Sequence, residues 1–453
     1  MVQLKETFHQ SLAIMTVGFN EFCAGMGMGW TAPTLLALQK SDSALFLSVA
    51  ELSWIASVDN FGRVLGGLLS AILLDKIGRR PILTMSGLIF FTVWSIIIFT
   101  KSVYTICAMR ILYGVAVGFQ TGSGSVYMGE NLSPSMRGVF GTLAIALYNF
   151  GIFLEYIIAT YFSFRTTAIT NFSIQGLLFL ASFWLREPVQ FLLMKGKQKQ
   201  ALENFMWLKG VTDANDVKND FEKITLNVQT EQAKKASFSK VLTSPANYKS
   251  AIIIMSIYIL SSLTGYWTIM SYASAIFPAS GIMSANEFTI LFAATQLIVT
   301  LVASFLVDNF NRRSLILISF SIVAFIHSCT ALLYYLQNNY FEIPYFPWVI
   351  FFSITLYSAV HVFAYPAIYL IRSELFPLSI RALATCLCMI GLAVTNFIMT
   401  KLFFNIYKNY GIHYNFMIFS ASSWTLVIFV YFALPETRNK SLLEIQEILE
   451  KQK

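Results

Sequence analysis

The chain has 453 residues, of which 56% are hydrophobic, 15% aromatic and only 12% charged. Soluble domains have about a quarter of their residues charged, so this composition excludes an ordinary soluble protein. The formal net charge of +8 is compatible with a nucleic-acid partner, but the basic residues flank apolar runs, as they do in membrane proteins. We therefore predict an all-α membrane protein, embedded in a lipid bilayer, that binds no nucleic acid.

Apolar runs of about 20 residues, long enough to cross the ~30 Å hydrocarbon core of a bilayer, recur along the whole chain. Six precede and six follow a polar segment. They predict twelve transmembrane helices at residues 12–38, 53–74, 82–100, 104–126, 138–161, 164–185, 249–277, 287–307, 314–336, 345–372, 382–407 and 413–434.

The first apolar run is too long for the core of a signal peptide and has no convincing cleavage site, so we expect it to remain as a span. Basic residues gather in alternate loops, which the positive-inside rule places in the cytoplasm. Both termini are therefore expected to be cytoplasmic. The basic residues of these loops are Lys76, Arg79, Arg80, Arg137, Arg312, Arg313, Arg381, Arg438 and Lys440.

The polar segment between the sixth and seventh runs is predicted to be a cytoplasmic linker with short amphipathic helices. Ala201, Phe205 and Leu208 follow each other at steps of three and four residues, which places them on one helix face. The predicted organisation is a first six-helix half (1–185), the linker (186–248), a second six-helix half (249–434) and a cytoplasmic tail (435–453).

Two short segments occur twice. DKIGRR at 75–80 recurs as DNFNRR at 308–313, and YMGENLSPSMRG at 127–138 recurs as IRSELFPLSIRA at 371–382. Each pair occupies equivalent positions in the two sets of six runs. Parallel repeats of this kind are the architecture of major facilitator transporters, which hold the solute near the bilayer midplane between two pseudo-symmetric halves.

These repeated segments predict a charged latch at the cytoplasmic ends of the helices. A carrier that alternates between two open forms needs interactions that separate and re-form, and charge pairs near helix ends provide them. The competing interpretation, that the basic residues only fix topology, does not explain the acids or the second copy. Gly62, Gly66 and Gly67 are expected to allow close helix approach. The latch candidates are Asp75, Arg79, Arg80, Glu130, Arg137, Asp308, Arg312, Arg313, Glu374 and Arg381.

Longer stretches around the repeats carry a family resemblance. They read GRVLGGLLSAILLDKIGRRP, RILYGVAVGF, EPVQFLLMKGKQKQALENFMWLKG, VDNFNRR, SELFPLSIR and LPETRNKSLLEIQ. In combination they resemble the sugar porter family of the major facilitator superfamily over nearly the whole chain, and GMGMGWTAPTLLAL and ELSWIASVDNFGRVLGG most resemble the facilitated trehalose and sugar transporters of insects. The resemblance implies facilitative transport of a hexose or trehalose-like sugar by alternating access, without a cofactor, by a monomer in the plasma membrane.

Several positions depart from the family pattern. Sugar porters carry QQLSGxNxxxYY in the seventh span, where the glutamines and the asparagine hydrogen-bond sugar hydroxyls. The run here reads SSLTGYWTIMSY, with Ser261 and Ser262 in place of the glutamines and Trp267 in place of the asparagine. Ile145 likewise replaces a fifth-span glutamine and Tyr369 a tenth-span tryptophan. Because a bound polyol must regain the hydrogen bonds that it made with water, a less hydroxylated solute remains open.

The polar and aromatic residues that remain are expected to line a site between the halves, with Trp267 as a stacking face. Helix packing is the competing role for each of them, and Gln296 and Asn396, where the family pattern is retained, are the preferred solute contacts. The candidates are Ser261, Ser262, Thr264, Trp267, Gln296, Tyr365, Tyr369, Thr395, Asn396 and Asn149.

Five ionisable residues fall well inside predicted spans of the first half: Glu21, Asp59, Arg63, Arg110 and Glu155. An unpaired charge at the centre of a span costs ~2.5 kcal/mol or more, so each needs a partner or a water-filled cavity. Counting ~1.5 Å of rise per residue places Glu21 and Arg63 at one depth and the other three at another. We expect a Glu21–Arg63 pair, an Asp59–Arg63 pair at i, i+4, and Arg110 bridging Asp59, Glu155 or both.

Arg110 matches a fourth-span arginine of sugar porters, in the motif RxxxG. In proton-coupled members this arginine lies near a first-span aspartate, whose position here is Met26. The resemblance therefore implies downhill transport, and we expect the buried charges to have a structural role. A gating or proton-linked role for Glu21 or Glu155 is the alternative.

Other classes fit less well. The five cysteines lie in apolar runs and the four histidines lack metal-ligand spacing, so we expect free thiols and no metal site. No nucleotide-binding loop or nucleophile motif indicates an enzyme. Asn171 begins a glycosylation sequon so near the sixth span that we do not expect its use. A carrier of a non-sugar solute and a transporter-like nutrient sensor remain alternative functions.

Overall fold

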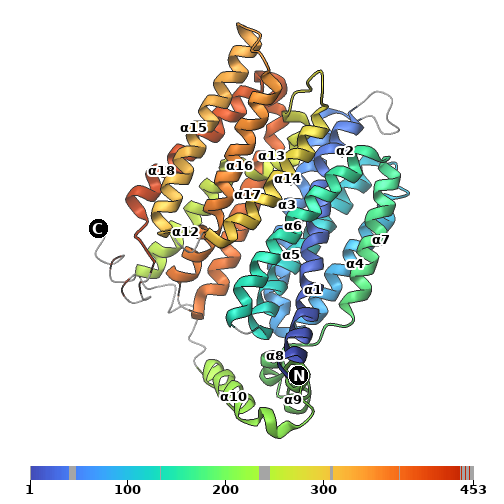
Figure 1. The fold of residues 1–453 in the computed structure, drawn as a ribbon, viewed down its shortest axis with the longest axis vertical. Helices are drawn as coiled ribbons and strands as arrows, with labels where there is room; N and C mark the ends of the chain where they lie inside the picture. Colours follow the sequence, from blue (N-terminus) through green and yellow to red (C-terminus); the bar gives the residue numbers. More distant parts are fainter. Residues whose placement is uncertain are drawn as a thin grey trace.

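A computed structural model describes residues 2–39, 47–132, 134–233, 245–306, 310–376 and 378–438, together with residues 440, 444 and 448. Within these ranges the chain is helical, with short turns and no strand. Figure 1 shows the helices from α1 to α7 on one side of an elongated bundle, and α12, α15, α16 and α18 on the other.

The first half begins with a broken helix. The predicted span 12–38 forms two helices, α1 and α2, separated at Trp30. The helices of this half are α1 (Val2–Gly29), α2 (Thr31–Leu38), α3 (Val49–Ile77), α4 (Arg79–Ile97), α5 (Val103–Asn131), α6 (Pro134–Tyr161) and α7 (Phe164–Ser182).

The second half also begins with a broken helix, because the predicted span 249–277 is interrupted at Gly265. Its helices are α12 (Pro245–Leu263), α13 (Tyr266–Ile276), α14 (Ala285–Leu306), α15 (Arg312–Asn339), α16 (Phe346–Leu375), α17 (Leu378–Tyr410) and α18 (Ile412–Ala433). With α12 and α13 counted as one, ten helices of the described chain are long and apolar enough to cross a membrane. The helices α1 and α7 are not among them, and α7 carries several polar side chains, including Asn171 and Gln175.

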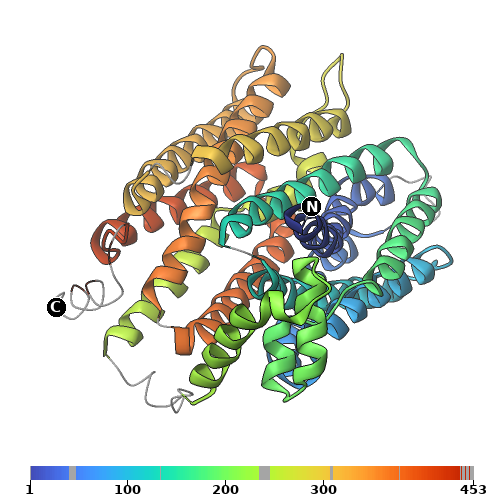
Figure 2. The same cartoon turned by 60° about the horizontal axis from the view of Figure 1, so that its bottom comes forward.

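Between the halves lie α8 (Val189–Met194), α9 (Gln198–Lys209), η1 (Ala214–Val217) and α10 (Lys218–Ala233). The predicted apolar face of the linker is present, since Ala201, Phe205 and Leu208 are all buried in α9. Figure 1 shows these helices gathered at one end of the bundle, and Figure 2 shows that end turned toward the viewer. We call this end the basic end, because α4 and α15 start there with Arg79–Arg80 and Arg312–Arg313, and the opposite end the far end.

Serine side chains begin several helices at the far end. Ser48 and Glu51 form a capping box at the start of α3, and Ser163 accepts a hydrogen bond from the Thr166 N–H at the start of α7. Ser284 and Glu287 make the same reciprocal bonds at the start of α14. These caps satisfy N–H groups that have no partner inside a helix, so they fix where the spans begin.

Glycines allow α3 and α5 to pack closely, as predicted. A Cβ atom on Gly62 would lie 2.0 Å from the carbonyl oxygen of Ile111, and one on Gly66 would lie 2.2 Å from that of Val115. Gly67 differs, because an added Cβ would meet nothing within 4 Å. The face of α3 that carries Gly62 and Gly66 is therefore packed on α5, whereas the position of Gly67 lies beside open space.

Four of the cysteines, Cys23, Cys107, Cys329 and Cys388, are free thiols, as predicted. The side chain of Cys386 lies outside the described part of the chain. No group of His, Cys, Asp or Glu that could hold a metal ion is found among the described residues.

Candidate functional site

Arg79 is the centre of a charged cluster at the basic end of the first half. Its side chain is 5% exposed, and its Nη2 atom lies 2.8 Å from Glu130 Oε1. Nη1 donates to the carbonyl oxygen of Leu74 at 3.0 Å and lies 3.5 Å from the exposed carboxylate of Asp75. The guanidinium also stacks over the ring of Phe191 in α8, 4.9 Å from its centroid. Arg79 thus ties α3, α4, α5 and the linker together.

Glu187, just after α7, caps the start of α4 from a distance of more than a hundred residues in sequence. Its Oε1 accepts hydrogen bonds from the backbone N–H groups of Arg79 at 2.5 Å and Arg80 at 3.4 Å. The guanidinium of Arg80 donates to the Phe183 carbonyl at 3.1 Å. Burial raises the pKa of Glu187, although the N–H groups and charges of Arg79 and Arg80 oppose this.

The second half repeats three features of this cluster. The backbone N–H groups of Arg312 and Arg313 each donate to Glu436 at 3.1 Å. Arg312 Nε lies 3.8 Å from Glu374 Oε1, as Arg79 lies beside Glu130, and Arg313 donates to the Tyr431 carbonyl, as Arg80 does to Phe183. Sequence reasoning missed both capping acids, although the short runs LREP at 185–188 and LPET at 434–437 close the two halves in the same way.

The predicted latch differs in one respect from the structure. Asp75, Arg79, Arg80 and Glu130 make all their described contacts within the first half and the start of the linker, so in this conformation they do not join the halves at the basic end. The physical reason is that their partners lie on neighbouring helices of the same half or on the linker segment that follows it. Three latch candidates lie outside the described chain, Asp308 entirely and Arg137 and Arg381 as side chains.

The buried charges of the first half surround Asp59. Arg63 Nε lies 3.4 Å from Asp59 Oδ2, as expected for residues four apart, and Arg110 Nη2 lies 3.6 Å from Asp59 Oδ1. Arg110 also donates to the carbonyl of Gly27 at 2.8 Å and to the hydroxyl of Thr31 at 3.1 Å. Arg110 therefore holds α5 against α1 and α2, which is a structural role.

Glu155 is bonded to Asn171 and not to Arg110, the partner that we expected. It is fully buried, and its Oε1 accepts a hydrogen bond from the amide of Asn171 at 2.7 Å, rather than contacting Arg110. Because Asn171 is itself fully buried, its side chain is not available to glycosylation in the folded protein. Glu21 is also not within ion-pair distance of any described arginine, although it interacts electrostatically with Arg63.

The break between α12 and α13 lies beside most of the predicted solute contacts. Gly265 has φ +87°, and a Cβ there would lie 2.6 Å from the ring of Phe419, so glycine is required. Ser262 Oγ donates to Asn396 Oδ1 at 2.5 Å across to α17. Ser261 and Thr264 instead donate their hydroxyl protons to backbone carbonyls of their own turn, so these protons are not available to a solute. The hydroxyl of Thr395 is used in the same way in α17.

Gln296 and Asn149 lie where α14 of the second half meets α6 of the first. Asn149 Nδ2 donates to Thr300 Oγ1 at 3.1 Å, which joins the two halves. Gln296, one turn from Thr300 on α14, is 1% exposed, and both polar atoms of its amide lack a hydrogen-bond partner among the described residues. A buried amide without a partner is costly in a folded protein, so Gln296 is the strongest candidate for a solute contact.

Aromatic rings form the wall between these polar groups. Trp267 of α13 contacts Tyr148 of α6 edge to face across the halves, with centroids 6.2 Å apart. Tyr266, the residue before Trp267 at the start of α13, stacks on His361 of α16 at 4.4 Å. The stack continues along α16 through Tyr365 and Tyr369, where the guanidinium of Arg372 lies over the Tyr369 ring. Such a surface suits a solute with flat apolar faces.

A second contact between the halves lies toward the far end, and sequence reasoning did not predict it. Lys401 Nζ of α17 lies 3.8 Å from the ring centroid of Trp54 in α3 and donates to Ser53 Oγ at 2.8 Å. The Trp54 ring also lies 6.1 Å from that of Phe397. Tyr156 adds a hydrogen bond to the Met270 carbonyl at 2.7 Å. We call Trp54, Phe397 and Lys401 the far-end clamp.

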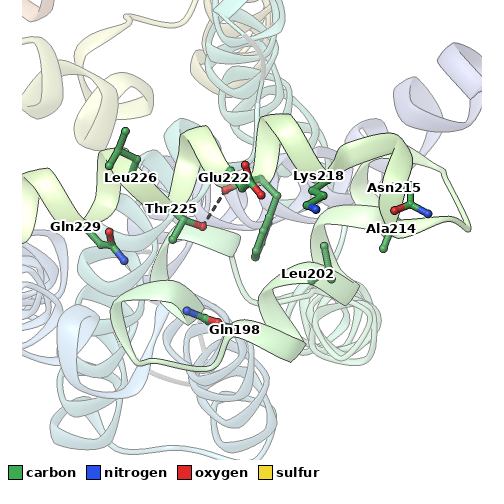
Figure 3. A pocket seen from close by; sticks show the side chains of 10 residues that line it. Gln198, Leu202, Ala214, Asn215, Lys218, Glu222, Thr225, Leu226 and Gln229 are labelled. Carbon is green, nitrogen blue, oxygen red and sulfur yellow. Dashed lines mark hydrogen bonds between the residues drawn. The ribbon is translucent and has the colours of Figure 1, made fainter.

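The hollow between α9 and α10, of about 520 Å³, is separate from this region (Figure 3). Its walls are the linker residues of α9, η1 and α10, among them Gln198, Leu202, Lys218 and Glu222. None of the predicted solute contacts or latch residues lines it. The candidate site is therefore the mid-membrane region between the halves.

Comparisons with known proteins agree with this geometry. Residues 13–449 match the family described as "Sugar (and other) transporter". The facilitated trehalose transporter Tret1 of Bombyx mori is 26% identical over 98% of this chain and 86% of that protein, and Tret1 of Apis mellifera ligustica is 26% identical over 96% and 87%. The fold is similar to the inward-open xylose transporter XylE of E. coli, a major facilitator protein, with a TM-score of 0.79 at 18% identity over 96% of this chain and 98% of that one. The protein is a member of the sugar transporter family.

Proposed function

We propose that the protein is a facilitative carrier that moves a hexose or trehalose-like sugar across a membrane by alternating access. The observation that carries this proposal is the pair of equivalent charged clusters at the basic end, one per half, together with a polar and aromatic region where the halves meet. Two halves that are each braced internally and that contact each other around a mid-membrane site suit a rocking carrier. Relatives named as facilitated trehalose transporters support a sugar as the solute.

The orientation and organisation follow from the charges. The basic end is proposed to face the cytoplasm, since Arg79, Arg80, Arg312 and Arg313 start helices there and the positive-inside rule favours that side. Residues 1–185 and 249–434 are the proposed moving halves, joined by the linker. The plasma membrane and a monomeric state complete the proposal.

A non-sugar solute is the second candidate, because the polar inventory of the site is small. Ser261 and Thr264 use their hydroxyls on their own helix, and Trp267 offers a ring rather than an amide. Proton linkage is a related candidate, because the buried carboxyl of Glu155 has an amide rather than a cation as its hydrogen-bond partner.

Exchange in proteoliposomes tests the proposal. The purified full chain should exchange at least one labelled hexose, trehalose or polyol by counterflow, and empty liposomes should not. The rate should stay constant between pH 5.5 and 7.5 and survive an uncoupler. Exchange of non-sugar solutes only would reject the sugar, whereas loss of exchange on dissipating the proton gradient would reject facilitation. A failure to exchange any solute of a wide panel would favour a nutrient sensor.

A further inference from the structure

Arg63 lies in the middle of α3, where an unpaired charge is costly in a membrane span. Its side chain is 21% exposed, whereas Phe61, Leu65 and Ile72 form the exposed apolar stripe of the same helix. At 100° per residue Arg63 projects from nearly the opposite side to that stripe. Its accessible surface therefore opens toward the interior of the bundle and not toward the apolar side that suits lipid.

The space beside Arg63 is open. Gly67, one turn along the same face of α3, has nothing within 4 Å of an added Cβ, and the same holds for Gly141 on α6. Ile145, one turn beyond Gly141, is 49% exposed on the face of α6 opposite the exposed Leu143 and Phe150. Tyr148, on the same face of α6 as Ile145, interacts with Arg63. The faces of α3 and α6 beside Arg63 therefore carry positions at which an added side chain would meet open space.

Arg63 has hydrogen-bond donors left for that space. A guanidinium carries five N–H donors, and in the described chain Arg63 uses them on a long hydrogen bond of 3.4 Å from Nε to Asp59 and on its interaction with Tyr148. Arg110 shares the same acid but is 2% exposed and uses its donors on Ile55, Gly27 and Thr31. The two arginines of the network therefore differ, one being enclosed and the other available.

An acceptor lies beside these donors. Glu21 of α1 is only partly buried and interacts electrostatically with Arg63, next to Gln120. Tyr148, on the other side of Arg63, contacts Trp267 of the second half. Arg63 and Glu21 thus offer a donor and an acceptor to a solute that lies against the rings of Tyr148 and Trp267.

We propose that Arg63 and Glu21 bind hydroxyl groups of the solute, with Arg63 donating to hydroxyl oxygens and Glu21 accepting hydroxyl protons. This proposal rests on the proposed sugar transport and deepens it. Charge-assisted hydrogen bonds are about twice as strong as neutral ones, so the guanidinium of Arg63, together with the carboxyl group of Glu21, replaces the amides that Ser261, Ser262 and Trp267 do not provide. The solute is a neutral polyol, because an anion beside Arg63 would also face the carboxylates of Glu21 and Asp59.

Binding measurements on the full-length protein in detergent and exchange in proteoliposomes test this assignment. Arg63→Gln and Glu21→Gln should each weaken binding of the exchanged sugar by about tenfold, seen as a higher KM and a smaller Tm increase on sugar addition. Gly67→Phe fills the space beside Arg63 without touching a charge, and should weaken binding as well. Arg110→Lys is the matched control, which should lower Tm but leave the sugar Kd unchanged.

The outcomes separate this proposal from the transport function. Wild-type protein that exchanges no sugar would overturn both. Wild-type exchange together with unchanged sugar affinity in Arg63→Gln, Glu21→Gln and Gly67→Phe would overturn the subsite alone. A loss of glucuronate binding in Arg63→Gln, with glucose binding intact, would overturn the assignment to neutral polyols. If Arg63→Gln does not fold, the Gly67→Phe result decides.

Discussion

Gln296 is 1% exposed, yet neither its amide nitrogen nor its oxygen has a hydrogen-bond partner within the described part of the chain. Asn396, the other preferred contact, is different, because its Oδ1 already accepts from Ser262. Two amide side chains that are equally buried therefore differ in what they contribute to stability. A side chain with a partner stabilises the fold, whereas one without a partner costs stability and is retained for another purpose.

Replacing Gln296 by Leu should separate these two effects. Removal of an unsatisfied buried amide at similar volume should raise the free energy of unfolding by about 1 kcal/mol, seen as a small increase in Tm. Loss of a solute hydrogen bond should raise the KM for the exchanged solute by about tenfold. A fall in Tm with an unchanged KM would assign Gln296 to packing instead.

Glu155 allows a similar separation. Glu155→Gln keeps an oxygen that accepts the Asn171 amide at the position of Oε1, while it removes an ionisable group from the centre of the bundle. Since an uncompensated charge inside a membrane protein is costly, Tm should rise or stay constant, and uptake should be unaffected. Loss of uptake in a well-folded Glu155→Gln protein would instead support proton-linked transport.

At the scale of helices, α4 and α15 begin in the same way. Glu187 accepts two backbone N–H groups at the first turn of α4, and Glu436 accepts two at the first turn of α15. A carboxylate at a helix N-terminus satisfies unpaired N–H groups and interacts favourably with the helix dipole. The start of a helix in each half is therefore fixed by an acid that lies just after the last helix of that half.

Glu187→Ala and Glu436→Ala should each reduce stability by about 1 kcal/mol, and the double variant should be additive because the sites lie in different halves. Thermal unfolding in detergent measures both effects. Glu203→Ala, a change on the linker helix α9 outside these caps, is the control. A single variant without any effect on Tm would show that its cap is dispensable.

The pH dependence of the Glu187 cap has a definite sign. Because burial raises the pKa of Glu187 in the folded protein, the folded state binds this proton more tightly than the unfolded state. Its contribution to stability is therefore greatest at low pH and is lost as pH rises through the folded-state pKa. The Tm of wild type relative to Glu187→Gln should fall between pH 5 and pH 8, and a rise would contradict this.

The positions of the helices and their buried faces could largely be predicted from the sequence, because spans and amphipathic helices are local patterns. Each predicted span has helices, and Ala201, Phe205 and Leu208 share the buried face of α9. Pairing is not a local pattern. Arg79 and Glu187 are 108 residues apart, and Lys401 lies 348 residues from Ser53. Depth counting placed Arg110 level with both Asp59 and Glu155, but the direction of each side chain, set by helix packing, selected Asp59.

At the scale of the molecule, the described contacts between the halves run from the middle of the spans toward the far end. Asn149 with Thr300 lies near the middle, and the clamp of Trp54, Phe397 and Lys401 lies nearer the far end. A cation over an indole ring contributes about 1 to 2 kcal/mol. Opening the far end must break this clamp, so the clamp favours the conformation seen here.

A crosslink across the far-end clamp should stop transport. In Trp54→Cys/Phe397→Cys protein, a bifunctional thiol reagent with a reducible spacer joins α3 and α17 at the place where the Trp54 and Phe397 rings now lie 6.1 Å apart, and the halves can then no longer separate at this end. Solute exchange should fall to the level of empty liposomes and recover when the spacer is reduced. Single-cysteine variants are the control, and undiminished exchange in the crosslinked double variant would exclude rocking about this interface.

The self-contained clusters of each half have a practical consequence. Arg79 with Glu130 and Glu187, and Arg312 with Glu374 and Glu436, brace their own sets of helices. Neither set needs the peptide connection to the other for these contacts. Two polypeptides divided after Ala233, the end of α10, should therefore assemble when co-expressed and give a working carrier from separate pieces.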